Sequence, residues 1–406
     1  MLIICHAFPP DMGGASFRGG NLASALRSRG HNVTVIAAFP YYPHGKIAAE
    51  YKKLLYLDER RDGIDVRRVW IPALSTRGLL NRVVIYAGFV FSCAINLLAM
   101  YRKHFDVVYY VSPYPLSFFS VPACIFGRLK RAIVIIDVAD LWPEVIVEVG
   151  GMSSGATGKL LIGMAKITAR LSNFVTVITD AISEKMSEIG LPSEKLRVIE
   201  MSIDTNFYSP SNLKGLRDSR FTRKFIAEYS GILGRKYDFD SLIQAARILQ
   251  DKTQDILVLI RGDGEQRQRV LKLSEGMDNV MVLTEIVTAQ QVVEYLNWAD
   301  VLLCPLKDSV EGATGVPSKV FEYLSVAKPV ICSGRGETAE LIESSQVGLA
   351  VPPENPKALA DAIFRLYRDS HARQIFSQRA RSIAEREFSW EKTASKIEDL
   401  CASIGK

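Results

Sequence analysis

Short apolar runs alternate along the chain with longer segments in which apolar positions recur at helical spacing. Runs that are apolar on both faces are typical of strands inside a parallel sheet, and the longer segments are typical of the helices that cover it. In the first half, such runs fall at residues 2–8, 32–39, 65–71, 106–111, 132–138, 174–178 and 197–201. In the second half, they fall at residues 225–229, 256–260, 280–284, 301–305, 330–332 and 348–351. The pattern predicts an α/β protein built from two similar halves.

The order of strand, glycine loop, helix and strand at the start of each half predicts two Rossmann-like domains. Their boundary is expected in residues 205–220, which are rich in Ser, Asn, Pro and charged residues. This gives a first domain at 1–205, a second at 206–380 and a final, mostly helical segment at 381–406. Residues 40–63 are polar and rich in tyrosine, and we expect them to form a loop.

Residues 83–101 contain no charge and lie between Arg82 and Arg102. Their length is close to the roughly 20 residues that a helix needs to cross a bilayer. A single crossing is excluded, because the strands on either side, 65–71 and 106–111, should belong to one sheet. Two alternatives stay open: the helix is buried in the core or in a dimer contact, or it lies on a membrane surface.

The flanking cations and the net charge favour the membrane surface for this helix. The formal net charge is +6, and residues 1–205 carry 23 Lys and Arg against 17 Asp and Glu, which leaves 27 of each in the remainder. Gly88, Ser92 and Asn96 form a stripe of small or polar groups, while Phe89 and Leu97 belong to the apolar remainder. Glutamate at Phe89 and Leu97 should then weaken membrane binding.

Composition excludes several other classes of protein. A hydrophobic content of 48% and a charged content of 23% are typical of a globular protein with a large core. Basic runs with interleaved aromatic residues, which bind nucleic acid, are missing. The six cysteines are scattered and the five histidines do not cluster, so we expect no structural metal and a reducing, cytoplasmic environment. The apolar start of the chain runs directly into a strand and does not read as a signal peptide.

The richest candidate site lies in residues 305–333. A loop that carries Glu311 is expected to lead into a helix that opens near Pro317, and helix starts of this kind bind phosphate. Glu322 comes four residues after Ser318 and lies on the same helix face, where a carboxylate can accept hydrogen bonds from a ribose. Phosphate and ribose together predict a nucleotide site. Its expected phosphate-binding residues are Thr314, Gly315, Val316, Ser318 and Lys319.

Other glycine loops follow predicted strands. Gly13 and Gly14 separate the first strand from the first helix, and Arg235 and Lys236 follow the glycines of the loop after residues 225–229. Gly262 lies in a short glycine turn, which is a weak signal alone but here follows a strand and precedes a helix, so we expect it to bind the nucleotide sugar. Glu285 follows the next strand and is expected to border the base. The remaining candidates are Arg18, near a helix start, and Asp140, in the sequence DLWPE.

The sequence GVPSKVFEYLSVAKPVICS resembles the donor-site helix of the retaining glycosyltransferases of family 4, which have the GT-B fold. The resemblance implies two parallel-sheet domains that face each other across a cleft, and a terminal helix that returns to the first domain. Members usually carry two glutamates eight residues apart, at the sugar and at the ribose. Glu322 matches the second, Thr314 stands at the first, and Glu311 is the nearest acid that could replace it.

The resemblance also implies roles for the other candidates. Gly13 and Gly14 would lie against the donor phosphates or the acceptor, and by position Arg235 and Lys236 would hold the diphosphate. Asp140 would orient the acceptor hydroxyl, although it could instead cap the following helix. Arg18 would hold an acceptor phosphate, or else form a surface ion pair.

The expected function is transfer of a sugar, with retention, from a nucleotide diphosphate sugar to a lipid-linked glycan in bacterial polysaccharide synthesis. Uridine is the favoured base and guanosine the second choice. No cofactor is expected, and no metal, because the site lacks a DxD-like pair. We expect the protein at the inner face of the plasma membrane. Two alternatives stay open: a nucleotide-sugar epimerase of the same fold, and an inactive nucleotide-binding partner.

Overall fold

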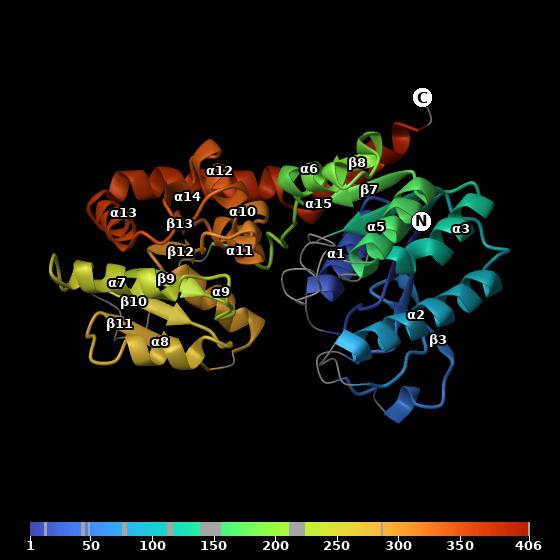
Figure 1. The fold of residues 1–406 in the computed structure, drawn as a ribbon, viewed down its shortest axis with the longest axis horizontal. Helices are drawn as coiled ribbons and strands as arrows, with labels where there is room; N and C mark the ends of the chain where they lie inside the picture. The colour runs from blue at the N-terminus through green and yellow to red at the C-terminus, as the bar shows by residue number, and fades with distance from the viewer. Residues whose placement is uncertain are drawn as a thin grey trace. The chain divides into compact units, whose positions relative to one another are not determined.

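The chain folds into two compact units, Met1–Glu200 with Trp390–Lys406, and Met201–Ser389 (Figure 1). The computed structural model describes residues 1–11, 14–41, 45–47, 49–74, 79–111, 117–138, 156–210, 224–285 and 287–404. The sequence placed the boundaries after residues 205 and 380. In the structure, the charged helix α14 (Ser370–Glu387) lies wholly in the second unit, and the first unit resumes only at Trp390.

The first unit contains an eight-stranded sheet in the order β3-β4-β2-β1-β5-β6-β7-β8. Every neighbouring pair is parallel except β3 with β4. The strands are β1 (Leu2–Cys5), β2 (Thr34–Ala38), β3 (Tyr56–Arg61), β4 (Ile64–Val69), β5 (Val107–Val111), β6 (Ile133–Val138), β7 (Phe174–Val177) and β8 (Leu196–Val198).

Strand β3 corrects the expectation of a loop over residues 40–63. It pairs antiparallel with β4, and its six residues are exposed or half-buried. As an edge strand it has a neighbour on one side only, so its sequence, YLDERR, lacks the apolar run that marked the other strands. Pairing with β4, not burial, makes this segment a strand.

Two helical layers cover the first sheet, each over its own core. One layer holds α2 (Leu79–Ala99), α3 (Val121–Leu129), α5 (Ala156–Leu171) and α6 (Asp180–Glu188). The other holds α1 (Gly14–Ser28) and the last helix, α15 (Trp390–Ala402). Glu398 of α15 binds Arg29 and His31 at 2.5 and 2.7 Å, and Lys396 binds Glu200 at 2.6 Å. The end of the chain is therefore part of the first unit.

Helix α2 contains most of the uncharged run. One side of the helix is buried and the other is exposed, so burial in the core accounts for only one of its two sides. Ile85, Phe89 and Leu97 are buried in the core, while Phe91 and Leu98 are 66% and 71% exposed. The substitutions expected to test membrane binding, at Phe89 and Leu97, would therefore break the core. No helix among the described residues has the length and apolar character needed to span a bilayer.

The second unit contains a six-stranded, fully parallel sheet in the order β11-β10-β9-β12-β13-β14. The strands are β9 (Phe225–Ser230), β10 (Ile256–Arg261), β11 (Val280–Leu283), β12 (Val301–Pro305), β13 (Val330–Ser333) and β14 (Gly348–Val351). The helices besides α14 are α7 (Phe239–Gln250), α8 (Arg267–Leu273), α9 (Ala289–Trp298), α10 (Val310–Thr314), α11 (Ser318–Ser325), α12 (Glu337–Ser344) and α13 (Pro356–Arg368).

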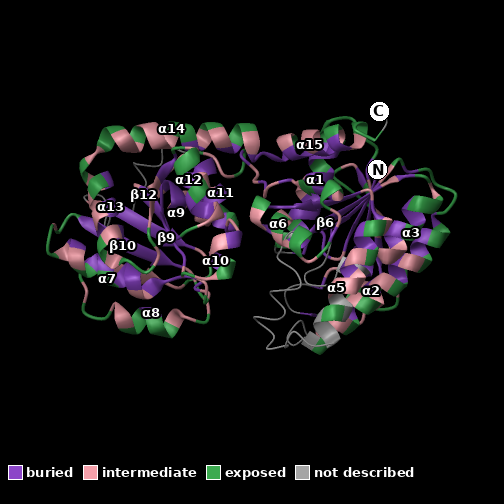
Figure 2. Cartoon of the chain, turned by 45° about the horizontal axis from the view of Figure 1, so that its top comes forward, coloured by how far each residue is buried: buried purple, intermediate pink, exposed green. Residues whose placement is uncertain are grey.

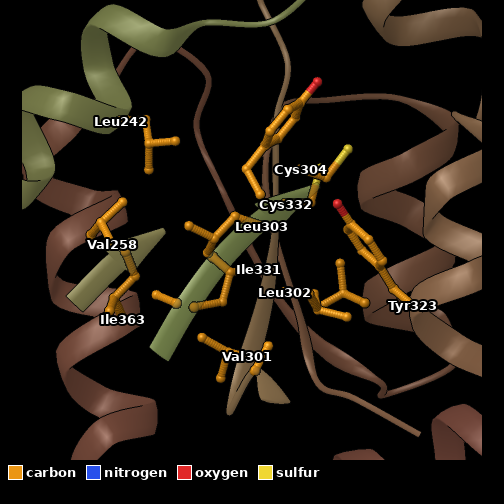
Figure 3. Close-up of a cluster of buried hydrophobic side chains, with 14 of the residues drawn as sticks. Leu242, Val258, Val301, Leu302, Leu303, Cys304, Tyr323, Ile331, Cys332 and Ile363 are labelled. Atoms are coloured by element: carbon orange, nitrogen blue, oxygen red, sulfur yellow. The ribbon is translucent and has the colours of Figure 1, made fainter. Parts of the chain in front are cut away.

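Uninterrupted apolar runs fill the core of this unit. Leu303 of β12 and Ile331 of β13 pack beside Val258 of β10 and Ile363 of α13 (Figure 3). In both units the central strands are buried and the helices present one face to solvent (Figure 2). The apolar pattern of the sequence therefore becomes two separate parallel-sheet cores.

The order of the second sheet reverses between β9 and β12. From β9 the chain adds β10 and β11 on one side, and it then returns to place β12 on the other side. In open parallel sheets, ligands bind beyond the carboxyl ends of the strands at such a reversal. The loops after β9 and β12 are therefore the expected walls of a site.

Candidate functional site

The loops after β9 and β10 touch through two glycines at the carboxyl end of the sheet. Gly231 follows β9 and Gly262 follows β10, with φ angles of 139° and 143° that favour glycine. A Cβ atom on Gly262 would lie 1.8 Å from the carbonyl oxygen of Gly231. From the sequence we expected Gly262 to bind the donor. Its close approach to Gly231 shows that the fold also requires glycine at this position.

The loop expected to carry Glu311 is instead the short helix α10. The Ser309 hydroxyl caps it by accepting a hydrogen bond from the Gly312 amide at 3.0 Å. The Thr314 hydroxyl is buried and donates to the Val310 carbonyl at 2.8 Å. This cap stabilises a helix in a segment whose glycines had suggested a loop. Thr314 therefore has a structural contact at the position where the resemblance implied a first glutamate.

Helix α11 begins at Ser318, directly after Pro317, and carries Glu322 one turn further along. Its Tyr323 hydroxyl bonds to the backbone N–H and C=O of Ser230, both at 3.0 Å. Since Ser230 is the last residue of β9, this pair of hydrogen bonds fixes α11 against the carboxyl end of the sheet. The predicted phosphate and ribose residues are thereby placed at the reversal point.

Lys319 has its ammonium group buried between two tyrosine rings. The Nζ atom lies 3.6 Å from the ring centroid of Tyr229 and 4.0 Å from that of Tyr237. It has no hydrogen-bond partner among the described residues, and a Cβ on Gly231 would lie 2.6 Å from it. Burial lowers the pKa of Lys319 to about 7, against the opposing influence of Cys304 and Glu322. A buried cation without a hydrogen-bond acceptor is well suited to an anionic ligand.

Glu322 is half-buried and lies near this cation. Desolvation raises the pKa of its carboxyl group, while the charge of Lys319 and a hydrogen bond from Tyr208 lower it. The carboxylate is thus held by a tyrosine from the start of the same unit. A fixed acceptor of this kind can bind a diol.

Lys236 and Glu311, assigned separately from the sequence, lie together. Lys236 Nζ is 3.7 Å from Glu311 Oε1, and both side chains are partly exposed. The backbone holds the two loops in contact, because Lys307 N–H donates to the Lys236 carbonyl at 2.9 Å and Tyr237 pairs with Leu306. A cation from the β9 loop and a carboxylate from the β12 loop therefore share one place.

Arg235 and Glu285 are not drawn into this cluster. Arg235 is 86% exposed and forms a surface ion pair with Glu265 at 2.8 Å. Glu285 is exposed just after β11, beyond the neighbouring strand β10. Their assignments to the diphosphate and the base remain predictions.

In the first unit, Arg18 has a partner that the sequence did not indicate. Its guanidinium is buried and binds the Asp137 carboxylate at 2.5 and 2.8 Å, and Asp137 also accepts from Thr176 at 2.9 Å. Burial lowers the pKa of Arg18, but Asp137 more than offsets this and raises it. Neither a surface ion pair nor an open phosphate site describes this contact. We leave Arg18 out of the proposed site.

The remaining assignments of the first unit differ in what the structure adds. Gly13 and Asp140 lie outside the described residues. Gly14 begins α1 and is exposed, with open space where a Cβ would stand. Sequence reasoning missed Tyr229 and Tyr237, whose only signal was their position on either side of the glycine loop.

Comparison with known proteins agrees with the two-unit architecture. A family described as "Glycosyl transferase 4-like domain" matches residues 13–201, and one described as "Glycosyl transferases group 1" matches residues 227–369. The putative colanic acid biosynthesis glycosyl transferase WcaI of Escherichia coli is 24% identical over 88% of this chain and 89% of its own. The amylovoran biosynthesis glycosyltransferase AmsK of Erwinia amylovora is 28% identical over 45% of this chain and 44% of its own.

The fold is similar to that of a solved structure. The Anabaena protein HepE, crystallised with UDP, superposes with a TM-score of 0.68 at 17% identity over 99% of both chains. Together with the two parallel-sheet domains, this likeness identifies the GT-B fold. The chain is therefore a glycosyltransferase of the GT-B fold, with a match to a glycosyl transferase 4-like domain at residues 13–201 and to a group 1 domain at residues 227–369.

Proposed function

We propose that this enzyme transfers a sugar from a uridine diphosphate sugar to an acceptor with retention of the anomeric configuration. The observation that carries the proposal is the cluster at the carboxyl end of β9 and β12. There, Lys236 on the loop after β9 lies near Glu311 of helix α10 and near Lys319 and Glu322 of helix α11. The crystallisation of HepE with UDP supports uridine as the base, and guanosine is the second choice.

Each member of the cluster has a role in the proposed reaction. The bond between the anomeric carbon and the diphosphate oxygen breaks, so negative charge grows on the leaving diphosphate. Lys319, Lys236 and the backbone of residues 314–319 stabilise that charge without a metal ion. Glu322 binds the ribose, and Glu311 contacts the sugar in place of the usual first glutamate. Asp140 is the sequence-based candidate for orienting the acceptor hydroxyl, whose oxygen forms the new bond.

The acceptor we propose is a lipid-linked glycan at the inner face of the plasma membrane, in bacterial polysaccharide assembly. Two relatives named for colanic acid and amylovoran biosynthesis support the polysaccharide. The exposed apolar face of α2 supports a lipid-linked acceptor.

A nucleotide-sugar epimerase of the same fold is the less favoured alternative. Such enzymes use acids and a histidine at the reacting carbon, and His6 follows β1 in the first unit. Burial lowers the pKa of His6 to about 4, and its ring packs edge-on against Tyr86 at 5.0 Å. A histidine that stays neutral and packed in this way is a poor proton carrier near neutral pH.

The decisive experiment is a thermal-shift screen of uridine, guanosine and adenosine diphosphate sugars, followed by mass spectrometry with a polyprenyl-diphosphate-linked acceptor. We expect a uridine diphosphate sugar to stabilise the protein and the acceptor to gain one sugar, also in the presence of EDTA. The anomeric coupling of the product in NMR tests retention. Conversion of the donor without acceptor would select the epimerase, and binding without turnover would select an inactive partner.

A further inference from the structure

The outward face of α2 is a continuous apolar strip on the surface of the first unit. Its exposed side chains recur at helical spacing: Leu80, Val84, Phe91, Ile95 and Leu98, with Tyr101 in the turn that follows. Three of them, Leu80, Phe91 and Leu98, are 76%, 66% and 71% exposed. A surface helix in water normally presents polar residues on this side. Exposure of this strip to water is therefore unfavourable, and we expect another molecule or a non-aqueous surface to cover it.

The strip continues onto two neighbouring helices. Helix α3 packs beside both α2 and α5 in the same layer. On α3, Ile125 and Leu129 are 49% and 63% exposed, and on α5, Ile167 is 51% exposed. We call residues 79–103, 121–131 and 156–171 the three-helix face. Half of the large hydrophobic side chains that are exposed among the described residues, nine of 18, lie on it.

The three-helix face contains no carboxylate. Its three segments hold nine cations and no Asp or Glu: Arg82, Arg102, Lys103, Arg128, Lys130, Arg131, Lys159, Lys166 and Arg170. The next helix of the layer, α6, carries Asp180, Glu184 and Glu188. Acidic residues are therefore absent from the three segments that carry the apolar strip, and they reappear on the next helix of the layer.

Some of these cations stabilise the fold, and others are exposed at the surface. Arg128 donates to the carbonyls of Leu171 and Arg170, and Lys130 donates to that of Tyr101. Cations at helix ends interact favourably with the helix dipole, which explains these two contacts. Arg102, Lys103, Arg131 and Lys159 are exposed. Stabilisation of helix ends gives no reason to exclude every acidic residue from three helices.

We propose that the three-helix face docks on an anionic phospholipid bilayer. Exposed Phe, Leu and Ile side chains would enter the boundary between headgroups and acyl chains, while the surrounding Lys and Arg would bind lipid phosphates. Neither feature suffices alone, because an apolar strip also suits a protein partner and a basic surface also suits other polyanions. Their coincidence on one face fits the lipid surface. This inference stands without the proposed donor site, and it would bring the enzyme to a lipid-linked acceptor.

The test is flotation of the full chain with vesicles of phosphatidylcholine, alone or mixed with phosphatidylglycerol. Wild type should float with the mixed vesicles and much less with the neutral ones. Phe91→Glu/Leu98→Glu should reduce binding at least about tenfold, from the loss of two buried side chains. Lys103→Gln/Arg131→Gln should reduce it about fivefold for each cation, only on anionic vesicles and most at low salt.

The matched control is Leu55→Glu/Leu271→Glu, which places the same charges on exposed apolar positions outside the three-helix face. This control should float like wild type. All variants should keep their thermal unfolding temperature and their binding of UDP, which separates a failure of docking from a failure of the donor site. Equal flotation of wild type and a folded Phe91→Glu/Leu98→Glu variant would overturn the proposal. A wild-type dimer that this variant converts to a monomer in light scattering, with unchanged flotation, would assign the face to a second copy instead.

Discussion

Lys236 Nζ lies 3.7 Å from Glu311 Oε1 and joins the loop after β9 to the helix after β12. The two residues are 75 positions apart in the sequence, and they meet because their strands are neighbours at the point where the sheet order reverses. The contact holds a carboxylate beside the expected diphosphate site, although the usual first glutamate is replaced by Thr314.

Glu311→Ala should lower turnover with little change in nucleotide affinity. If Glu311 contacts the transferred sugar, its loss removes an interaction with the reacting group and should reduce kcat by about 10- to 100-fold, or roughly 1.4–2.7 kcal/mol. The affinity for UDP alone, measured by calorimetry, should stay within about twofold. Asp308→Ala is the control, since Asp308 pairs with Arg335 on the neighbouring loop. Intact turnover of Glu311→Ala beside an inactive Asp140→Ala would place the chemistry on the acceptor side.

Glu322→Ala should weaken nucleotide binding itself. Loss of charged hydrogen bonds to the ribose should cost roughly 1–3 kcal/mol in the binding of UDP. Glu322→Gln keeps the shape of the side chain and one acceptor, so its loss should be smaller. Glu340→Ala, on the exposed side of α12, is the matched control. Calorimetry that finds the same UDP affinity in wild type and Glu322→Ala would remove Glu322 from the ribose.

Binding of a uridine diphosphate sugar should weaken as the pH rises above about 7. Burial lowers the pKa of Lys319 to about 7, so above this pH the free protein holds a neutral amine. A bound diphosphate favours the ammonium form, and binding should therefore take up a proton. Calorimetry in buffers of different ionisation enthalpy measures this uptake directly. The charged groups that act on the Lys319 amine include Lys236 and Glu322. Burial raises the pKa values of Tyr229 and Tyr237, so both phenol groups stay neutral near pH 7.

Two variants assign the pH dependence to Lys319. Lys319→Met should bind more weakly and lose the proton uptake. Cys304→Ala should keep the proton uptake. This variant tests the other titratable group near Lys319, because a hydrogen bond from Cys332 and the charges of Lys319 and Lys236 lower the pKa of Cys304. In the unliganded protein, the unfolded state holds the proton of Lys319 up to about pH 10.5, so this group alone makes unfolding less favourable as pH rises from about 7. A pH-independent affinity would show that Lys319 does not face the diphosphate.

Gly262→Ala should destabilise the second unit. The new Cβ would meet the Gly231 carbonyl at 1.8 Å, and the φ angle of 143° is unfavourable for alanine. Overlap and backbone strain together should lower the free energy of unfolding by about 2–5 kcal/mol. Gly234→Ala is the control, because the nearest atom to its Cβ would be 3.8 Å away. Urea unfolding of both variants decides the comparison, and equal midpoints would mean that the loops separate at little cost.

Asp137→Ala should destabilise the first unit by about 3–5 kcal/mol, because it leaves the buried Arg18 guanidinium without its counter-ion. Arg18→Met/Asp137→Leu removes both charges and should recover much of the loss. Asp65→Ala is the matched surface control, since Asp65 and its partner Arg60 are each 69% exposed and such pairs contribute at most about 1 kcal/mol. Chemical unfolding measures all three. A double variant as unstable as Asp137→Ala would assign the loss to packing and not to the charge.

The apolar runs of the sequence predicted the strands of both sheets except β3, because a strand buried on both faces is apolar along its whole length. The local spacing of Ser318 and Glu322 likewise placed both in one helix, as α11 shows. Such features depend on residues that are close in the chain. These local features can be predicted without knowing which distant segments meet in the folded protein.

Tertiary structure decided the features that depend on distant neighbours. β3 is a strand because β4 lies beside it, and part of the uncharged run in α2 is exposed because only one side of that helix meets the sheet. Asp137 is the partner of Arg18 across 119 positions, and two tyrosines enclose Lys319. Periodicity in a sequence reports whether a side chain is buried. It does not report which distant side chain it is buried against, and that contact sets the charge and the chemistry of a site.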